Sequence, residues 1–413
     1  MSYDLLLKNA TVIDPSQNLN AIRDVAIQNT TITALSESIT DSARETLDLT
    51  GKILTPGWID IHAHVFAGAT TWGIQADALC LATGVTTIVD AGSPGWANFL
   101  AFRDFIATPA RTQILTFVHI SGIGLTYGPI GEMTDIKYAD PERTAYVVHT
   151  YPETCVGVKV RISKTITGEN GVVPLQLAVQ AADMTHTPVM VHMGAGVALS
   201  DILAELRPGD IVTHCYRGDG DATIGDTILN RQHNIRPEVH CARQQGILFD
   251  VGHGGGSFLF ETAKKALAQD FLPDIISTDI HSGSINDPVY SLPETASKLL
   301  NLGIELPDII RQTTTSAAAA IGRSGHLGTL KIGTIADLSA FEIREGEFRF
   351  HDVRDNLEIG RKNIHPVLTI RAGKVYRPET LREERDETLA RAREIRALTS
   401  RRFRDLGWTP PGA

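Results

Sequence analysis

Cysteine is scarce in this chain, with four residues among 413, and none of them forms a C-x-x-C pair. The four positions are widely separated: Cys80, Cys155, Cys215 and Cys241. This spacing argues against a disulfide framework and predicts reduced, mostly structural thiols in a cytoplasmic protein.

The chain also lacks long apolar runs and an excess of positive charge. No uninterrupted apolar run approaches the roughly 20 residues that span a bilayer, and the acidic residue Asp4 in the first segment is unlike a secretion signal. The net charge of -10 argues against nonspecific binding to nucleic acid, which requires positive charge to neutralise phosphates. We therefore expect a soluble cytoplasmic protein that binds neither membranes nor nucleic acid.

Apolar residues make up 42% of the chain and charged residues 21%, which is typical of a globular protein with a large core. The length allows for about two domains. Between residues 57 and 322, short apolar runs that end in polar or glycine-rich loops alternate with helix-like segments. Eight such runs predict the α/β class, as a parallel (β/α)8 TIM-like barrel. We expect its strands at 57–65, 84–92, 113–122, 155–163, 188–194, 211–218, 246–254 and 275–282.

The two flanks of this region contain β-like runs separated by turns. We predict that residues 1–55 and 325–380 form one small β-sandwich domain, which leaves residues 56–324 for the barrel. The tail, 381–413, mixes acidic and basic residues and predicts a solvated helix that covers another surface of the chain or of a neighbouring subunit. We expect a homo-oligomer.

The run TPGWIDIHAHVF carries two histidines, His62 and His64, two residues apart. Alternate residues of a strand point to the same face, so both imidazoles would share one side. Two imidazoles on one face can bind one metal ion, but they can also be ordinary packed residues. The motif therefore needs further ligands from the rest of the chain.

The carboxyl ends of the strands form the active face of such barrels, and several expected strands end in ionisable residues. Each alone has a structural explanation, such as an ion pair or a capped carbonyl. Together they favour a functional cluster, because ionisable groups are rarely buried without a partner or a metal. The residues are His62 and His64 on the first strand, Lys159 on the fourth, His192 on the fifth, His214 on the sixth and Asp279 on the eighth.

With these motifs, the chain resembles the amidohydrolase superfamily of metal-dependent hydrolases over nearly its whole length. The matching segments are PGWIDIHAH, VGVKVRIS, VMVHMG, IVTHC and STDIH. The resemblance implies two divalent ions, with zinc the first expectation for nitrogen and oxygen ligands. It places one ion on His62, His64 and Asp279, the second on His192 and His214, and a carbamate between them, formed from carbon dioxide on Lys159.

The segments FDVGHGGGSF and STDIHSGS narrow the resemblance to a deacetylase branch whose members are often labelled dihydroorotases. Dihydroorotases usually carry an arginine two places after the second histidine to bind the substrate carboxylate, whereas this chain has Phe66. We therefore expect hydrolysis of a small acyl amide or ester, with acetyl as the expected acyl group. In this hypothesis, a hydroxide bridging the two metals would attack the carbonyl, and Asp279 would act as the general base.

Four further residues are candidate substrate contacts. Arg161 lies two residues beyond Lys159 on the same strand face, and either binds a substrate carboxylate or forms a structural ion pair. His281 stands in the same relation to Asp279 and either contacts substrate or orients the aspartate. His253 precedes three glycines, which allow close approach of a ligand or a flexible turn. Tyr216 shares the face of His214 by alternation.

Two alternatives to an acyl hydrolase stay open. The first alternative is a cyclic-amide hydrolase of the dihydroorotase or hydantoinase kind. The second is a metal-free scaffold protein on the same fold. The scaffold is disfavoured because every expected ligand position is filled.

Overall fold

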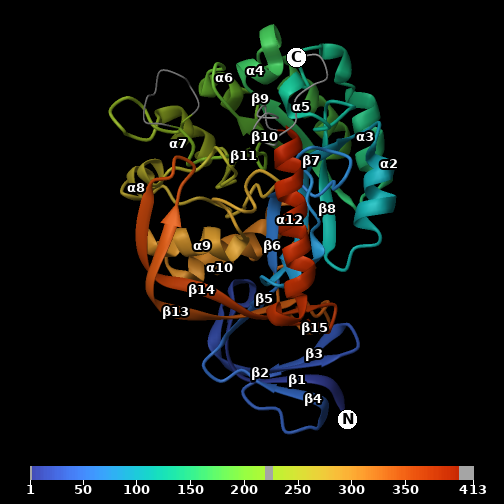
Figure 1. Cartoon of the computed structure of the whole chain (residues 1–413), viewed down its shortest axis with the longest axis vertical. Helices are drawn as coiled ribbons and strands as arrows, with labels where there is room; N and C mark the ends of the chain where they lie inside the picture. Colours follow the sequence, from blue (N-terminus) through green and yellow to red (C-terminus); the bar gives the residue numbers. More distant parts are fainter. Residues whose placement is uncertain (1, 219–226, 400–413) are drawn as a thin grey trace, which may run out of the picture.

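A computed structural model describes residues 2–218 and 227–399 of the chain. Two sheets organise the fold (Figure 1). A curled parallel sheet with surrounding helices forms the larger part, and a second sheet lies at the lower end of the view, beside the N-terminus. The fold is thus of the mixed α/β type, as predicted.

The parallel sheet contains seven strands in sequence order, each hydrogen-bonded to the next. All seven coincide with expected strands, so the hydrophobic pattern located them correctly. They are β6 (Trp58–Ala63), β7 (Val85–Gly95), β8 (Gln113–His119), β9 (Cys155–Ile162), β10 (Val189–Met193), β11 (Ile211–Thr213) and β12 (Leu248–Asp250).

The eighth expected strand forms only isolated bridges. Its segment pairs with β12 at Ile275 and with β6 at Ile280, both in parallel. The ladder is interrupted because Asp279 has a left-handed backbone, with φ of 46°. The backbone N–H of Asp279 still donates to the carbonyl of His62 over 2.6 Å. Backbone contacts therefore link β12 to β6 through this segment, as a (β/α)8 barrel requires.

Helices follow the barrel strands and cover the outside of the sheet (Figure 1). Clear start signals precede two of them: Asp140 and Ser291 accept hydrogen bonds from backbone N–H groups of the first turn, and a proline lies just inside each helix. The helices are α1 (Asp77–Leu81), α2 (Phe99–Phe102), α3 (Pro141–Thr150), α4 (Lys164–Thr167), α5 (Val173–Thr185), α6 (Leu199–Ala204), α7 (Pro237–Gln244), α8 (Phe260–Leu267), α9 (Leu292–Asn301), α10 (Leu306–Thr313) and α11 (Thr315–Ala320).

The second sheet combines both flanks of the chain. The predicted β-sandwich is not confirmed, because the hydrogen bonds join these strands into one eight-stranded sheet. β5 makes this continuity possible, since it pairs in parallel with β1 and antiparallel with β13. The strands are β1 (Tyr3–Asp14), β2 (Leu19–Gln28), β3 (Thr31–Ser36), β4 (Ala43–Asp48), β5 (Ile53–Pro56), β13 (Leu338–His351), β14 (Leu357–Arg371) and β15 (Lys374–Tyr376).

Gly57 connects this sheet to the barrel, between β5 and β6. A side-chain carbon built on Gly57 would lie 2.1 Å from the hydroxyl oxygen of Thr86, so only glycine fits beside β7. The Pro-Gly step of the motif thus lets β6 enter the barrel at a fixed position. The two histidines follow directly.

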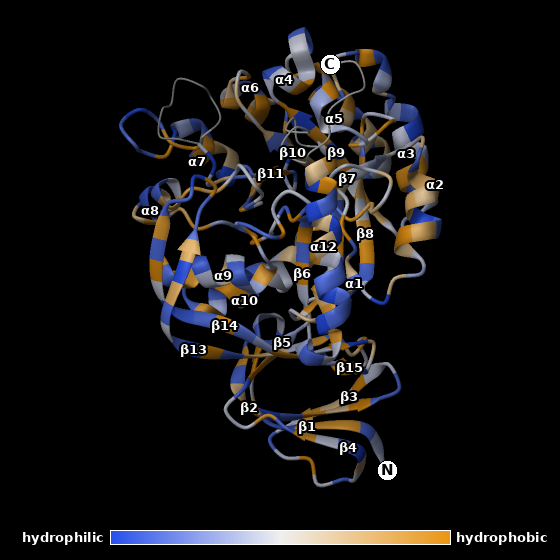
Figure 2. Cartoon of the chain, viewed as in Figure 1, coloured by the Kyte–Doolittle hydropathy of each residue, from blue (hydrophilic) through white to orange (hydrophobic). Residues whose placement is uncertain are grey.

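The predicted charged helix is present as α12 (Arg382–Thr399). It is largely hydrophilic (Figure 2) and buries only Thr388 and Ala392. Arg393 Nη1 donates to Asn286 Oδ1 over 2.9 Å, which ties the helix to the barrel. The rest of the predicted tail, 400–413, lies outside the described residues. No helix within the described parts is long and apolar enough to cross a bilayer.

Candidate active site

A cavity of about 320 Å³ opens among the loops that follow the barrel strands. Seven of the ten predicted site residues lie in its lining, and His214, His253 and Tyr216 do not. The lining consists of His62, His64, Trp72, Leu125, Lys159, Arg161, His192, Arg217, Gly255, Gly256, Ser257, Asp279, His281 and Gly283.

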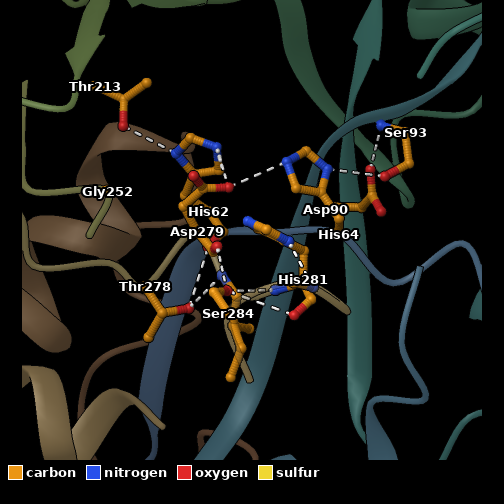
Figure 3. A network of polar contacts seen from close by, with 12 residues as sticks. His62, His64, Asp90, Ser93, Thr213, Gly252, Thr278, Asp279, His281 and Ser284 are labelled. Atoms are coloured by element: carbon orange, nitrogen blue, oxygen red, sulfur yellow. Dashed lines mark hydrogen bonds and ion pairs between the residues drawn. The ribbon is translucent and has the colours of Figure 1, made fainter. Parts of the chain in front are cut away.

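The first group of predicted ligands converges on one carboxylate oxygen (Figure 3). Asp279 Oδ1 lies 3.4 Å from His62 Nε2 and 3.2 Å from His64 Nε2. Lys159 Nζ lies 3.3 Å from His62 Nε2, on the same side. Ligand atoms of the two histidines and the aspartate all fall within 4.8 Å of one another. This donor set fits a divalent ion such as zinc.

A buried relay orients His62 for such a role. The Thr213 hydroxyl donates to Asp250 Oδ2 over 2.7 Å, so it accepts from His62 Nδ1, which lies 2.9 Å away. The Ser277 hydroxyl also donates to Asp250 Oδ2. His62 therefore carries its proton on Nδ1 and presents a lone pair on Nε2. Outer partners of this kind set the ring orientation of metal-binding histidines.

A matching relay orients His64. Its Nδ1 lies 2.9 Å from the Ser93 hydroxyl, and that hydroxyl is hydrogen-bonded to the carboxylate of Asp90. Asp90 also accepts from the backbone N–H of Val65 over 2.7 Å. The lone pair of His64 is therefore also on Nε2, facing Asp279.

His214 has the same tautomer as His62 and His64, set by a different contact. Its Nδ1 lies 2.6 Å from the carbonyl oxygen of Gly252, which can only accept, so the proton is on Nδ1. Its Nε2 is buried and has no hydrogen-bond partner among the described residues. A buried lone pair without a partner is rare, and a metal ion would satisfy it.

His192 differs from these three histidines because an arginine donates a hydrogen bond to its Nε2. Its ring lies 4.4 Å from that of His214. However, Arg217 Nη1 donates to His192 Nε2 over 3.2 Å and to the carbonyl of Met193 over 3.1 Å. His192 and His214, the second pair of predicted ligands, thus lie side by side, and Arg217 is hydrogen-bonded to His192.

Burial determines the charges of these groups. It lowers the pKa of Lys159 to about 7 and that of His214 to about 3, and it lowers the pKa of His62 and His192. Burial raises the pKa of Asp279, but the neighbouring histidines outweigh it and hold the value well below the usual range. The cluster thus contains an ionised aspartate beside the neutral imidazoles of His62, His192 and His214.

Two further contacts fix the position of Asp279. The preceding Thr278 donates its backbone N–H to Asp60 Oδ1 over 3.0 Å and its hydroxyl to Asp60 Oδ2 over 2.5 Å. On the other side, a carbon built on Gly254 would lie 2.2 Å from Asp279 Oδ2. The glycine-rich loop therefore approaches the carboxylate closely, and a side chain at position 254 would displace it.

Arg161 and His281 both line the cavity, as predicted. Arg161 is paired with Glu132, a residue that the sequence analysis did not select. His281 Nδ1 accepts from the backbone N–H of Gly283 over 3.0 Å. Burial lowers the pKa of His281 to about 4, so the ring is neutral and its Nε2 carries a proton.

The other two candidate substrate contacts do not reach the cavity lining. The hydroxyl of Tyr216 donates to the carbonyl of Phe271 over 2.9 Å, and His253 stacks on Phe258 with its Nε2 bonded to Lys298. The alternation argument fails at Tyr216 because β11 ends at Thr213 and His214 has a φ of 74°. The adjacent Arg217 lines the cavity instead.

Comparison with known proteins gives a consistent family assignment. Residues 53–376 match the amidohydrolase family. A deacetylase from Agrobacterium fabrum is 38% identical over 326 residues, covering 78% of this chain and 79% of the relative. A deacetylase from Enterococcus faecalis is 34% identical over 91% of this chain and its own full length. The crystal structure of an adenine deaminase matches with a TM-score of 0.85 at 34% identity, covering 91% of this chain and 100% of that one.

Proposed function

Because this chain belongs to the amidohydrolase family, and is a hydrolase, we propose that it removes a small acyl group, acetyl in the first instance, from an amide or an ester. The observation that carries this proposal is the convergence of His62, His64 and Asp279 beside Lys159 at the cavity. The deacetylase relatives that span most of the chain support the choice of acyl group.

The proposed centre holds two divalent ions, with zinc as the first choice. His62, His64 and Asp279 would hold one, and His192 and His214 the other. Ions bound there would polarise the acyl carbonyl and lower the pKa of water. The orphaned Nε2 of His214 supports the second position.

Lys159 would supply the group between the ions. A charged ammonium would repel them, whereas burial lowers the pKa of this amine to about 7 and favours the neutral form. A neutral amine adds to carbon dioxide, forming a nitrogen–carbon bond and losing a proton. The resulting carbamate carries one negative charge on two oxygens, which are suitable ligands.

Asp279 is the proposed general base. Its carboxylate is ionised and lines the cavity, so it can accept the proton of the attacking water and pass it to the leaving nitrogen or oxygen. The relays behind His62 and His64 keep both rings directed at this carboxylate. The reaction thus depends on positions that are fixed before substrate binds.

Substrate contacts come from the rest of the lining. His281 presents an N–H on Nε2, and Arg161 retains N–H groups beyond the two that bond Glu132. We propose that these donors bind a polar or carboxylate group of the substrate. The cavity volume of about 320 Å³ suits a small molecule.

The cyclic-amide alternative receives less support. Phe66, which stands where dihydroorotases usually have arginine, is buried with its ring 5.3 Å from that of Phe102 and is absent from the cavity lining. It therefore offers no contact to a ring substrate.

The test is hydrolysis by zinc-loaded, bicarbonate-treated enzyme across one panel. The panel contains N-acetyl amino acids of both hands, acetyl esters of 2-hydroxy acids, dihydroorotate and hydantoins. We expect release of acetate. Ring opening alone would transfer the assignment to cyclic amides, and silence across the panel with no bound metal would favour a scaffold protein.

A further inference from the structure

One of the four histidines proposed as metal ligands differs from the others because an arginine donates to one of its ring nitrogens. His62, His64 and His214 each donate from Nδ1 and direct the lone pair of Nε2 toward the proposed metal centre, where Nε2 of His62 lies 3.3 Å from Nζ of Lys159, the amine of the proposed carbamate. His192 instead accepts at Nε2 from Arg217, over 3.2 Å. An arginine side chain always donates, so the direction of this bond is certain.

This hydrogen bond leaves His192 without a free lone pair. A neutral imidazole has one N–H and one lone pair. Since Nε2 uses its lone pair on Arg217, the proton must be on Nδ1, and neither nitrogen can then bind an ion. If an ion binds Nε2, it takes the place of Arg217. If it binds Nδ1, the proton moves to Nε2 and faces an N–H of Arg217, which repels it.

We propose that Arg217 and the second metal ion compete for His192, so that the two ions load in order. The first ion enters at His62, His64 and Asp279, whose ligand atoms lie within 4.8 Å of one another. The second ion enters only as Arg217 leaves His192. This inference rests on the proposed two-metal centre.

The surroundings of Arg217 make its release feasible. It lines the cavity, so its guanidinium can move into open space rather than through packed side chains. Its second acceptor is the backbone carbonyl of Met193, at 3.1 Å. These two acceptors lie on adjacent residues at the end of β10.

The experiment measures zinc binding to metal-stripped protein in bicarbonate buffer, by calorimetry with a competing chelator. We expect two unequal sites in the wild type. In Arg217→Met, the second site should tighten about tenfold or more, since a hydrogen bond from a charged donor is worth about 1.5–3 kcal/mol. The first site should be unchanged. Arg361→Met, which removes an exposed positive charge on β14, is the matched control and should change neither site.

A second measurement follows the histidine itself. In protein labelled with ¹⁵N-histidine, we expect the ring signals of His192, assigned with His192→Gln, to show a protonated Nδ1 without metal. They should change only with the second equivalent of zinc. An unchanged second affinity in Arg217→Met, or a His192 change with the first equivalent, would refute the competition. Binding of a single ion in every variant would instead refute the two-metal centre.

Discussion

Arg161 and Glu132 form a two-point ion pair at the cavity wall, in which Nε donates to Oε1 over 2.6 Å and Nη2 to Oε2 over 2.8 Å. Glu132 is almost fully buried, with 1% of its surface exposed. Burial raises the pKa of Glu132, but the charge of Arg161 and its hydrogen bonds outweigh this and hold the pKa well below its usual range. The carboxylate is therefore ionised, and it fixes the guanidinium of Arg161 in the cavity wall.

Glu132→Gln should destabilise the protein by about 3–5 kcal/mol at neutral pH, because Arg161 is left buried without its counter-charge. A lowered carboxyl pKa contributes stability above the unfolded value of 4.5, and this contribution is lost as the pH falls through the lower folded value. The difference between wild type and variant should therefore shrink below about pH 4.5. Urea unfolding at pH 7 and below pH 4 measures it.

The matched control is Glu169→Gln, which breaks an exposed pair with Lys164. It should change the unfolding midpoint little at either pH. An equal effect of the two substitutions would contradict the stabilising role of the Arg161 pair.

Asp279→Asn should lower kcat by about 10²–10⁴, because the amide cannot accept a proton. Zinc content must be measured on the same samples, since Asp279 is also a proposed ligand. The far-ultraviolet circular dichroism should match that of the wild type. Turnover near the wild-type rate at equal metal content would exclude the general-base role.

Thr213→Val should weaken zinc binding about 10–100-fold, because His62 loses the acceptor that holds its proton on Nδ1. Thr213→Ser keeps the hydroxyl and should bind zinc nearly as the wild type does. Chelator competition gives both affinities. Similar affinities for the valine and serine variants would show that the relay does not orient His62.

Lys159→Ala should lose the second ion, because the proposed carbamate is absent. Zinc content should fall from about two ions per chain to about one, with kcat falling in parallel. Propionate can enter the space left by the side chain and should restore part of both. Full zinc binding by Lys159→Ala without added carboxylate would argue against the carbamate.

The sequence predicted most of the proposed metal centre because regular strands place residues by simple rules. His62, Lys159 and His192 lie within predicted strands, and alternation correctly directs them to the cavity. The same rule fails where the backbone leaves the extended region. Beyond His214, with its positive φ, alternation selected Tyr216, whereas Arg217 faces the cavity.

Contacts made by long loops could not be predicted from local patterns. Glu132 comes from the loop between β8 and α3 and meets Arg161 on β9. Trp72 enters the lining from the loop after β6, with its ring 4.6 Å from that of His281. Neither residue has a motif of its own. The pairing between β5 and β13, which joins the two flanks into one sheet, similarly has no local signal.

The position of β5 between β1 and β13 also has a consequence during synthesis. Leu54 pairs with Ala340, about 290 residues later in the chain. At roughly 5–20 residues per second on the ribosome, about 15–60 s pass between the synthesis of β5 and that of β13. During that time one edge of the N-terminal sheet is unpaired and can form hydrogen bonds with strands of other nascent chains. Chaperone binding to this edge would protect the growing protein until β13 emerges.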